Sequence, residues 1–390
     1  MIRIGILSHY HNSTNYGGAL QAYALCKVLN DMGYDSEQID VDCFAECKNL
    51  TETVSITKKI IRKIKPIYRG LNTLRYHKSK VLRCNLQSAF RDFNENFIPH
   101  SAKKYDCKNI AETLDRYDIF IVGSDQVWNP IWYFEPFFLS FAPSDVPKIS
   151  YAASIAQSKL SLDVKQIYKQ HLKDFCAVSV REENAVELLK DISPVDVEYV
   201  LDPTLLLDDG EWKHIASKKI VDKPYVFCYF LGENNKIRSI AKEYAHKHNL
   251  VLVNIQHATG QYHKSDIDYG DIRLEAPSPN DFLSLTEYAD MVFTDSFHAC
   301  VFSLIFKRQF FVFEREGHTN MSSRITSLMN LYKTENRLCN TVERVNTEYI
   351  YRQQNIDYSK TGLLSEQKKR ASIDFLVRNL NEATKNIVKN

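Results

Sequence analysis

A histidine directly follows the end of a short apolar run in the second half of the chain. The run Met291-Val292-Phe293 passes into Thr294-Asp295-Ser296-Phe297-His298, and residues 299–306 are again mostly apolar. This order predicts a strand that ends in small polar residues and a buried helix that starts at once, with backbone N–H groups at the carboxyl edge of a sheet. A histidine there can donate to a phosphate or transfer a proton near neutral pH. The alternative is a capped helix whose histidine is only packed.

Two further polar groups follow predicted strands in the first half of the chain. Asn15-Tyr16-Gly17-Gly18 lies between the first strand and the first helix, where glycines allow a ligand to approach the backbone. Ser124-Asp125-Gln126, with Trp128-Asn129 behind it, follows a strand over 117–122. Asp125 can accept from sugar hydroxyls and Trp128 can stack on a sugar face. The alternatives are a plain turn in the first case and an Asp-capped turn over a core tryptophan in the second.

Arginines supply the positive charge that an anionic substrate requires. Arg181 directly follows a strand over 177–180 and can bind a carboxylate or phosphate bidentately; the alternative is a salt bridge to Glu182 or Glu183. With His298, polar and basic residues at the start of a later helix can form a second anion site. These residues are Asn320, Ser322 and Arg324.

Strands and helices alternate along the chain, and these elements must position the polar residues. We expect strands over 3–7, 36–41, 117–122, 148–153, 177–180, 225–231, 250–254, 291–294 and 310–313. We expect helices over 19–32, 185–190, 236–249, 281–289, 322–331 and 365–379. The alternation predicts an α/β fold of two Rossmann-like, doubly wound domains that face a cleft, as in the GT-B arrangement of many glycosyltransferases. The expected units are residues 1–206, residues 207–360 and a C-terminal helix in 361–390.

A basic segment over residues 55–96 interrupts the alternation. Between Lys58 and Arg83, ten Lys and Arg residues are interleaved with Ile and Leu, and Pro66 and Gly70 divide the segment into short helices. We expect a solvated helical insertion in the first domain. The alternative is a basic amphipathic surface that contacts anionic lipid or a lipid-diphosphate acceptor.

Composition excludes several classes of protein. The 390 residues are 44% hydrophobic with a net charge of +2, which is typical of a globular protein with no bias toward nucleic acid. The nine cysteines form no C-x-x-C pair, and neither dinucleotide-binding, P-loop nor metalloprotease motifs occur, so we expect no metal or bound cofactor. Residues 2–7 are typical of a first strand rather than a signal peptide, so we expect a cytoplasmic protein.

Seven short blocks, taken in order, resemble the polysaccharide pyruvyl transferase family. They are Asn15-Tyr16-Gly17-Gly18-Ala19-Leu20-Gln21-Ala22, Gly123-Ser124-Asp125-Gln126-Val127-Trp128-Asn129, Ser150-Tyr151-Ala152-Ala153-Ser154, Val180-Arg181-Glu182, Asp202-Pro203-Thr204, Thr294-Asp295-Ser296-Phe297-His298 and Ser323-Arg324. Each block alone is weak, but seven in order are specific. The basic insertion and the C-terminal segment lie outside the resemblance.

The resemblance implies a GT-B-like fold, phosphoenolpyruvate as donor and a bacterial capsular or exopolysaccharide sugar, such as galactose or another hexose, as acceptor. The product would be a cyclic pyruvate ketal across two hydroxyls. Arg181 and His298 match positions that contact the donor in the family. Many members carry an arginine two residues before this histidine, where this chain has Ser296. Binding of the donor then depends on Arg181, Arg324, Lys307, Arg308 or helix amides.

The chemistry of ketal formation assigns a role to each candidate residue. His298 is the candidate general acid, with phosphate binding as its alternative role, and Asp125 is the candidate acceptor of the hydroxyl proton. Arg181 holds the donor. The remaining expected substrate-binding residues are Asn15, Tyr16, Gly17, Gly18, Ser124, Gln126, Trp128, Asn129, Ser296, Asn320, Ser322 and Arg324.

Two other functions fit the same sequence. One is a GT-B glycosyltransferase that uses a nucleotide sugar, and the other is a binding protein of this fold without activity. The glycan acceptor is either soluble or linked to polyprenyl diphosphate. A linked acceptor would bring the protein to the inner face of the cell membrane.

Overall fold

The computed structural model describes residues 1–42, 47–51, 73–256, 264–266, 268–315, 322–339 and 345–389, with side chains left out at 73–79, 322 and 388–389. Two six-stranded sheets form the frame, and every strand pair in both is parallel. The expected α/β fold with two doubly wound sheets is therefore confirmed.

The first sheet has the order β2-β1-β3-β4-β5-β6. Its strands are β1 (Arg3–Leu7), β2 (Asp35–Gln38), β3 (Ile119–Val122), β4 (Lys148–Ala153), β5 (Ala177–Val180) and β6 (Val197–Tyr199). The strand order reverses between β1 and β3, so the carboxyl ends of these two strands open toward the position where such sheets bind ligands.

The second sheet repeats this arrangement with the order β12-β11-β10-β7-β8-β9. Its strands are β7 (Tyr225–Tyr229), β8 (Val251–Ile255), β9 (Ile272–Leu274), β10 (Met291–Thr294), β11 (Gln309–Phe313) and β12 (Leu338–Cys339). Here the order reverses between β7 and β10. The Asp295 carboxylate bridges this point, because it accepts from the backbone N–H groups of Leu231 at 2.6 Å and Gly232 at 2.8 Å.

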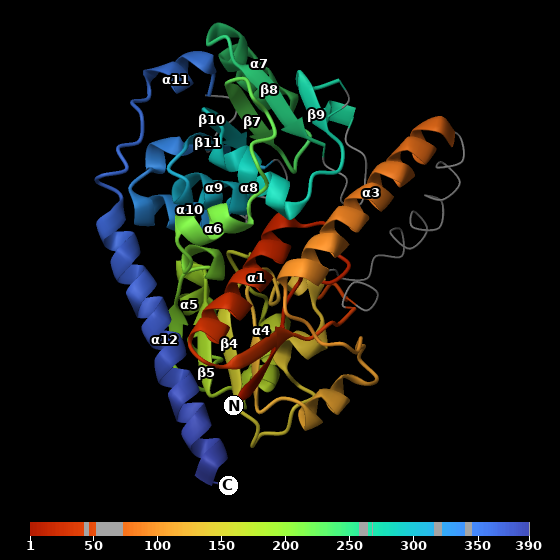
Figure 1. Cartoon of the computed structure of the whole chain (residues 1–390). Coiled ribbons are helices and arrows are strands. Elements are labelled where there is room, and N and C mark those ends of the chain that lie inside the picture. Colours follow the sequence, from red (N-terminus) through yellow and green to blue (C-terminus); the bar gives the residue numbers. More distant parts are fainter. Residues whose placement is uncertain are drawn as a thin grey trace.

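Helices cover both sheets and fill the space between them (Figure 1). The α-helices are α1 (Tyr16–Asp31), α3 (Thr73–Phe97), α4 (Leu162–Leu172), α5 (Glu183–Leu189), α6 (Asp209–Ile215), α7 (Asn235–Lys247), α8 (Pro279–Glu287), α9 (Phe297–Ile305), α10 (Ser322–Tyr332), α11 (Thr347–Arg352) and α12 (Gly362–Lys389). Short 3-10 helices are η1 (Ile110–Asp115), η2 (Pro130–Trp132), η3 (Glu135–Phe138), η4 (Pro203–Leu205), η5 (Lys264–Asp266) and η7 (Glu335–Arg337). None of the described helices combines the length and the apolar character that crossing a bilayer requires.

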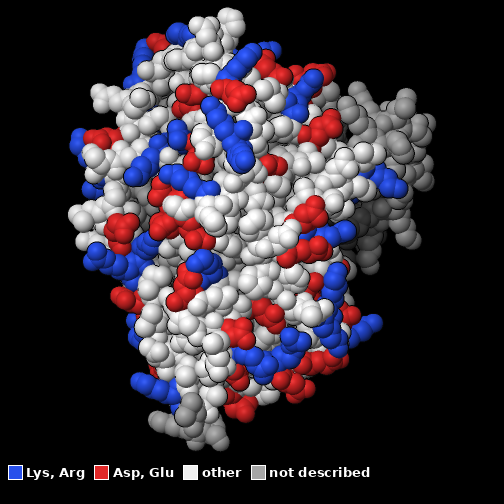
Figure 2. All heavy atoms as spheres, viewed as in Figure 1, with Lys and Arg blue, Asp and Glu red and all other residues white. Residues whose placement is uncertain are grey.

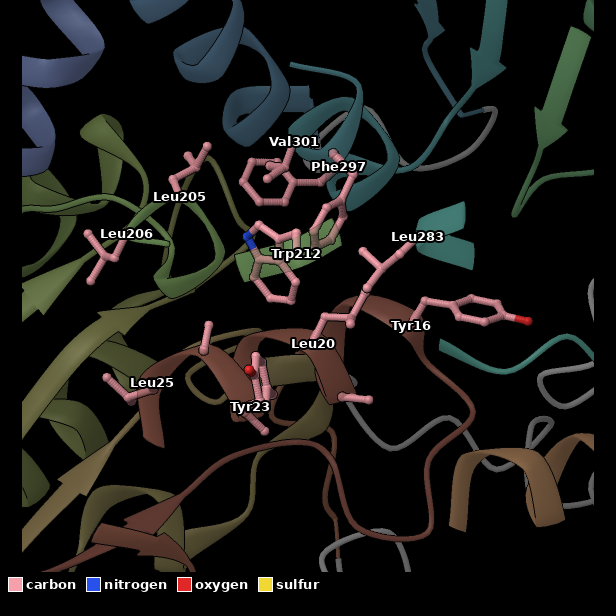
Figure 3. Close-up of a cluster of buried hydrophobic side chains, with 14 of the residues drawn as sticks. Tyr16, Leu20, Tyr23, Leu25, Leu205, Leu206, Trp212, Leu283, Phe297 and Val301 are labelled. Carbon is pink, nitrogen blue, oxygen red and sulfur yellow. The ribbon is translucent and has the colours of Figure 1, made fainter. Parts of the chain in front are cut away.

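An apolar cluster joins the two sheets (Figure 3). Leu20 and Tyr23 of α1 pack with Trp212 of α6, and α8 and α9 contribute further side chains to the same cluster. The ring centroid of Trp212 lies 5.7 Å from that of Tyr23 and 4.9 Å from that of Phe302. Because burial of apolar surface drives such contacts, this cluster fixes how the carboxyl edges of the two sheets face one another.

Helix α12 connects the two units a second time. It runs from α10 beside the second sheet along the edge of the first sheet (Figure 1). The Ser372 hydroxyl accepts from the backbone N–H of Leu201 at 2.9 Å, and Arg378 pairs with Glu198.

The described part of the basic segment is a single helix that belongs to the core. In α3, Leu82, Leu86, Phe90 and Phe93 are buried at spacings of one helical turn, and α3 packs against α1 and α8. Lys80 and Arg83 lie on its exposed side. The expectation of a solvated insertion is therefore wrong for residues 80–96, whereas the division into short helices at Pro66 and Gly70 lies outside the described residues. On the face seen in Figure 2, basic and acidic side chains are interspersed.

Candidate active site

Arg181 lies at the centre of a buried group of charges at the carboxyl edge of the first sheet. It directly follows β5 and is 3% exposed. Its Nη1 donates to Asp202 Oδ2 at 2.5 Å and its Nη2 donates to Asp125 Oδ1 at 2.9 Å. The alternative of a pair with Glu182 or Glu183 is therefore wrong. Both terminal nitrogens donate to carboxylates from other loops, and Nε has no hydrogen-bond partner among the described residues.

Asp125 connects this arginine to the loop between β1 and α1. It follows β3, and its Oδ2 accepts from Asn15 Nδ2 at 2.9 Å. Asn15 is the N-cap residue of α1, yet its side chain makes no capping bond because it is directed to Asp125. Burial alone would raise the pKa of Asp125, but the charges of Arg181, His298, His9 and Arg324 together outweigh burial and lower it. Asp125 is therefore an ionised acceptor at neutral pH.

Asp202 is a site residue that sequence reasoning did not single out. Its Oδ2 accepts from Arg181 and, at 3.0 Å, from the Ser124 hydroxyl, while its Oδ1 accepts from the backbone N–H and hydroxyl of Thr204. Burial opposes ionisation, but the approach of His298 and the charge of Arg181 hold the pKa of Asp202 well below its usual range. The signal was present, since Asp202-Pro203-Thr204 is one of the seven family blocks.

His298, from the second unit, approaches the carboxylate of Asp202. It lies in the first turn of α9, and its Nε2 is 3.6 Å from Asp202 Oδ2, which is an ion-pair distance longer than a hydrogen bond. His298 is 6% exposed, and its Nε2 has no hydrogen-bond partner among the described residues. Arg181, Asp125 and His298, predicted from three distant segments, therefore meet in one place.

Gly17 packs directly against this imidazole. A Cβ atom at position 17 would lie 1.8 Å from His298 Nδ1, which no side chain can tolerate. Residues 16–18, expected to precede the first helix, form the first turn of α1, which begins at Tyr16. Glycine is required at this position by a tertiary contact rather than by a turn.

We expect Gly17→Ala to lower kcat/KM about 100-fold, because the methyl group displaces the His298 ring and a displacement of about 1 Å at a catalytic group has an effect of this size. Steady-state kinetics of the purified variant would measure it. The matched control is Gly362→Ala, where a Cβ atom meets nothing within 4 Å. Turnover of the Gly17 variant at the control's level would show that the position of His298 is unimportant.

Two guanidinium groups flank the ring of Phe297. The Cζ atoms of Arg181 and Arg324 lie 4.8 Å and 5.8 Å from its centroid. Burial and the neighbouring Arg181 lower the pKa of Arg324 to about 10, so it remains cationic at neutral pH. Within the described part of the chain, Arg324 forms no ion pair and its Nε has no hydrogen-bond partner. A bound anion would pair with the buried charge of Arg324 and offset the cost of burying it.

Two helix N-termini converge on the same place. His298 is in the first turn of α9 and Gly17 is in the first turn of α1, and they are in contact. The N-cap residues Asn15 and Ser296 make no side-chain capping bond. Free N–H groups and the positive end of the helix dipole favour an anion at each terminus.

Glu182 is a further buried carboxyl group of this region. It accepts from the Ser154 hydroxyl and from the backbone N–H of Ile155. Burial raises its pKa, although Arg181 and Arg324 oppose the shift. Within the described residues, no three His, Cys, Asp or Glu side chains come together as metal ligands do.

Two aromatic residues expected to contact substrate are core residues instead. Trp128 is fully buried, its Nε1 donates to the Phe137 carbonyl at 3.0 Å, and it stacks on Phe138. The Tyr16 hydroxyl donates to the Pro277 carbonyl at 2.7 Å, and its ring stacks on Phe282 between the two units. The prediction that Trp128 stacks on a sugar is therefore wrong, and Tyr16 belongs to the domain contact seen in Figure 3.

The other predicted binding residues have structural partners or lie outside the description. Asn129 caps η2 and donates to Gln126 Oε1 at 2.7 Å. A Cβ atom at Gly18 would lie 2.5 Å from the His9 carbonyl oxygen. Asn320 and the side chain of Ser322 are outside the described residues. Lys307 and Arg308 follow the C-terminal end of α9, away from the helix start that carries His298, so they do not join this group.

His9 is a second site residue that the sequence did not reveal. Burial lowers its pKa to about 4, against the opposing charge of Asp125. The His9 imidazole therefore binds its proton more weakly in the folded protein than in the unfolded chain. The stability that it contributes is therefore fully present above pH 6.5 and is lost as the pH falls toward 4.

We expect the free energy of unfolding of the wild type to fall by roughly 3 kcal/mol between pH 6.5 and 4 through His9 alone, since one pKa unit corresponds to about 1.4 kcal/mol. Urea unfolding at a series of pH values would measure this slope. The His9→Gln variant should show a correspondingly shallower slope, and identical slopes in both proteins would refute the assignment.

The two parallel sheets with flanking helices form a fold of the GT-B type. The chain is similar in structure to the UDP-GlcNAc 2-epimerase of Methanocaldococcus jannaschii in complex with UDP-GlcNAc and UDP, with a TM-score of 0.54, 12% identity, and 98% and 99% of the two chains covered. It is also similar to a putative UDP-N-acetylglucosamine 2-epimerase of Listeria monocytogenes, with a TM-score of 0.53, 11% identity, and 100% and 97% of the two chains covered. A glycosyltransferase of Rickettsia africae matches with a TM-score of 0.51, 11% identity, and 100% and 99% of the two chains covered. At these identities the likeness shows the fold alone.

The sequence pattern of the polysaccharide pyruvyl transferase family matches residues 15–317. The chain therefore belongs to the polysaccharide pyruvyl transferase family and is a transferase. None of the curated proteins matches it by sequence.

Proposed function

We propose that the protein transfers the enolpyruvyl group of phosphoenolpyruvate to a pair of sugar hydroxyls, forming a cyclic pyruvate ketal in a bacterial capsular polysaccharide or exopolysaccharide. Galactose or another hexose is the expected acceptor. The observation that carries the proposal is the meeting of two uncapped helix N-termini, Arg324 and His298 at one point between the sheets. This arrangement suits a small ligand with several negative charges.

The charges of the site support this donor. Arg181 is already neutralised by Asp125 and Asp202, whereas Arg324 is not paired within the described residues. Phosphoenolpyruvate carries a carboxylate and a phosphate. In this proposal Arg324 and the N–H groups of α9 take over the role of the arginine that many family members carry at the position of Ser296.

The reaction assigns a proton transfer to His298. A sugar hydroxyl oxygen bonds to the central carbon of phosphoenolpyruvate while a proton adds to its methylene carbon, which becomes a methyl group. The second hydroxyl then bonds to the same carbon, the carbon–oxygen bond to phosphate breaks, and phosphate leaves with the proton of that hydroxyl. His298 delivers the proton to carbon, and Asp202 stabilises the protonated imidazole from 3.6 Å. Asp125 accepts the hydroxyl proton, and no metal or further cofactor takes part.

The acceptor is a soluble glycan or one linked to polyprenyl diphosphate, and the linked form would place the protein at the inner face of the cell membrane. Most of the basic residues that motivate the linked form lie outside the described residues. Lys80 and Arg83, on the exposed side of α3, are the members of that group whose side chains are described.

Thermal unfolding in the presence of candidate donors tests the proposal. A ligand that binds only the native state raises the melting temperature, and at 100 times its Kd the gain is about 2.7 kcal/mol. We expect phosphoenolpyruvate to stabilise the protein and UDP-GlcNAc to have no effect. The opposite result would identify a glycosyltransferase that uses a nucleotide sugar, and no effect of either ligand would favour a binding protein without this activity.

A further inference from the structure

A cavity lies at the carboxyl edge of β1 and β2, on the same edge of the first sheet as Asp125 and Arg181. Its volume is about 250 Å³, and its walls come from the β1–α1 loop, the residue Asp40 after β2, one side of α3, and His100 and Lys104. Drug-sized ligands occupy pockets of roughly 300–1,000 Å³, so this cavity suits a group the size of a single sugar ring.

A buried His–Asp pair forms one wall of the cavity. His11 Nδ1 contacts Asp40 Oδ1, and the two side chains are 12% and 8% exposed. The Asp40 backbone N–H donates a hydrogen bond to the Ser101 hydroxyl at 2.9 Å. A carboxylate on Nδ1 holds a proton there and leaves Nε2 available to hydrogen-bond a ligand. The candidate active site does not use this pair.

Two further polar atoms of the lining residues are buried without a hydrogen-bond partner in the described part of the chain. They are the hydroxyl of Tyr10, a residue 3% exposed, and Oδ1 of Asn94 on α3. An unsatisfied buried polar atom costs about 1–3 kcal/mol, so native structures rarely retain one without a ligand or water to satisfy it.

These groups favour a ligand rich in hydroxyls. Asn94 Oδ1 accepts hydrogen bonds, and each sugar hydroxyl both donates and accepts, so it can pair with Asn94 Oδ1, the Tyr10 hydroxyl and His11 Nε2. A diphosphate has no such donors, and it would meet the carboxylates of Asp40 and Glu95. Although Arg91 and Lys104 also line the cavity, the mixture of both charges around neutral acceptors suits a polyhydroxylated ring better than an anion.

The cavity and the candidate active site share one loop. Tyr10, His11 and Ser13 line the cavity, and Asn15, two residues after Ser13, donates to Asp125. Two residues of extended chain span at most about 7 Å. The wall of the cavity at Ser13 therefore lies within about 7 Å of Asn15, the residue that donates to Asp125 of the candidate active site.

We propose that this cavity is the acceptor subsite of the transferase and that it binds one hexose ring of the glycan through His11, Asn94 and Tyr10. The inference rests on the proposed function, since it takes the sugar as acceptor. It adds the place of binding and the residues that select the acceptor.

Saturation-transfer NMR with the methyl glycosides of galactose, glucose, mannose and N-acetylglucosamine tests the subsite on the full-length protein. We expect at least one glycoside to bind the wild type and to bind His11→Ala and Asn94→Leu at least tenfold more weakly. The matched controls are His214→Ala, an exposed histidine on α6, and Asn96→Leu, an exposed asparagine on α3 two residues beyond Asn94. Both controls should bind the glycoside as the wild type does.

The thermal shift caused by phosphoenolpyruvate, measured on the same proteins, separates this inference from the proposed function. Retained stabilisation by phosphoenolpyruvate with lost glycoside binding supports the subsite and also shows that each variant is folded. Unchanged glycoside affinity in both variants, or no glycoside binding to the wild type, would overturn the subsite even if phosphoenolpyruvate binds. Binding of pyrophosphate that is lost in the two variants would also overturn it, by identifying a diphosphate site. Absence of stabilisation of the wild type by phosphoenolpyruvate would count against the donor alone.

Discussion

Replacement of His298 by alanine should lower turnover with phosphoenolpyruvate by a factor of about 10²–10⁴, the range that a general acid or base contributes. The ring approaches Asp202 from the second unit, and the other hydrogen bonds of Asp202 come from the first unit and remain in the variant. The fold should therefore survive. Phosphate release in the presence of acceptor measures the rate, and circular dichroism on heating measures the fold.

A second substitution separates the two roles of His298. Glutamine at this position can still donate a hydrogen bond to a phosphate but cannot deliver a proton at neutral pH. If His298→Gln is as inactive as His298→Ala, the residue is the proton donor; if it retains most of the activity, His298 is a phosphate ligand. His246→Ala, an exposed histidine on α7, is the matched control. Turnover of His298→Ala close to that of this control would show that the histidine is only packed.

Removal of the Arg181 side chain should destabilise the protein by about 3–5 kcal/mol, the usual effect of breaking a buried ion pair. Arg181→Ala leaves Asp125 and Asp202 without their shared cation, and both carboxylates are almost completely buried. Urea unfolding at neutral pH would measure the difference. Arg352→Ala is the matched control, because Arg352 pairs with Glu348 on the surface, and exposed pairs contribute at most about 1 kcal/mol.

Arg181→Lys should recover only part of this stability, since lysine keeps the charge but cannot donate to two carboxylates in the fixed geometry of a guanidinium. A loss in Arg181→Ala no larger than in Arg352→Ala would mean that the two carboxylates are not ionised in the folded protein. The depressed pKa values of Asp125 and Asp202 would then be wrong as well.

The sequence predicted the frame of the molecule because buried parallel strands are strongly apolar. The runs that became β3, β5 and β10 are almost entirely hydrophobic and end in polar residues, so strand, strand end and candidate residues could be assigned together. Strands β6, β9 and β12 were missed. They are edge strands of two or three residues with mixed composition, and such segments carry no periodic signal.

The errors at the site arise from tertiary contacts that no local sequence pattern encodes. Whether Trp128 faces a ligand or the core depends on η3, which supplies both its hydrogen-bond acceptor and its stacking partner. The start of α1 was placed too late because Gly17 suggests a loop, whereas the close approach of His298 requires a glycine inside the helix. Asp202 gains its role from Arg181 and His298, residues that are far from it in the sequence.

Mass spectrometry of glycan acceptors incubated with the protein and phosphoenolpyruvate tests the central claim most directly. Candidate acceptors are soluble oligosaccharides and polyprenyl-diphosphate-linked ones, with His298→Ala as the inactive control. We predict a product heavier than the acceptor by one pyruvate less one water, formed with release of one phosphate and absent with the His298 variant. Transfer of a sugar from a nucleotide sugar instead, with no ketal from any acceptor, would contradict the claim.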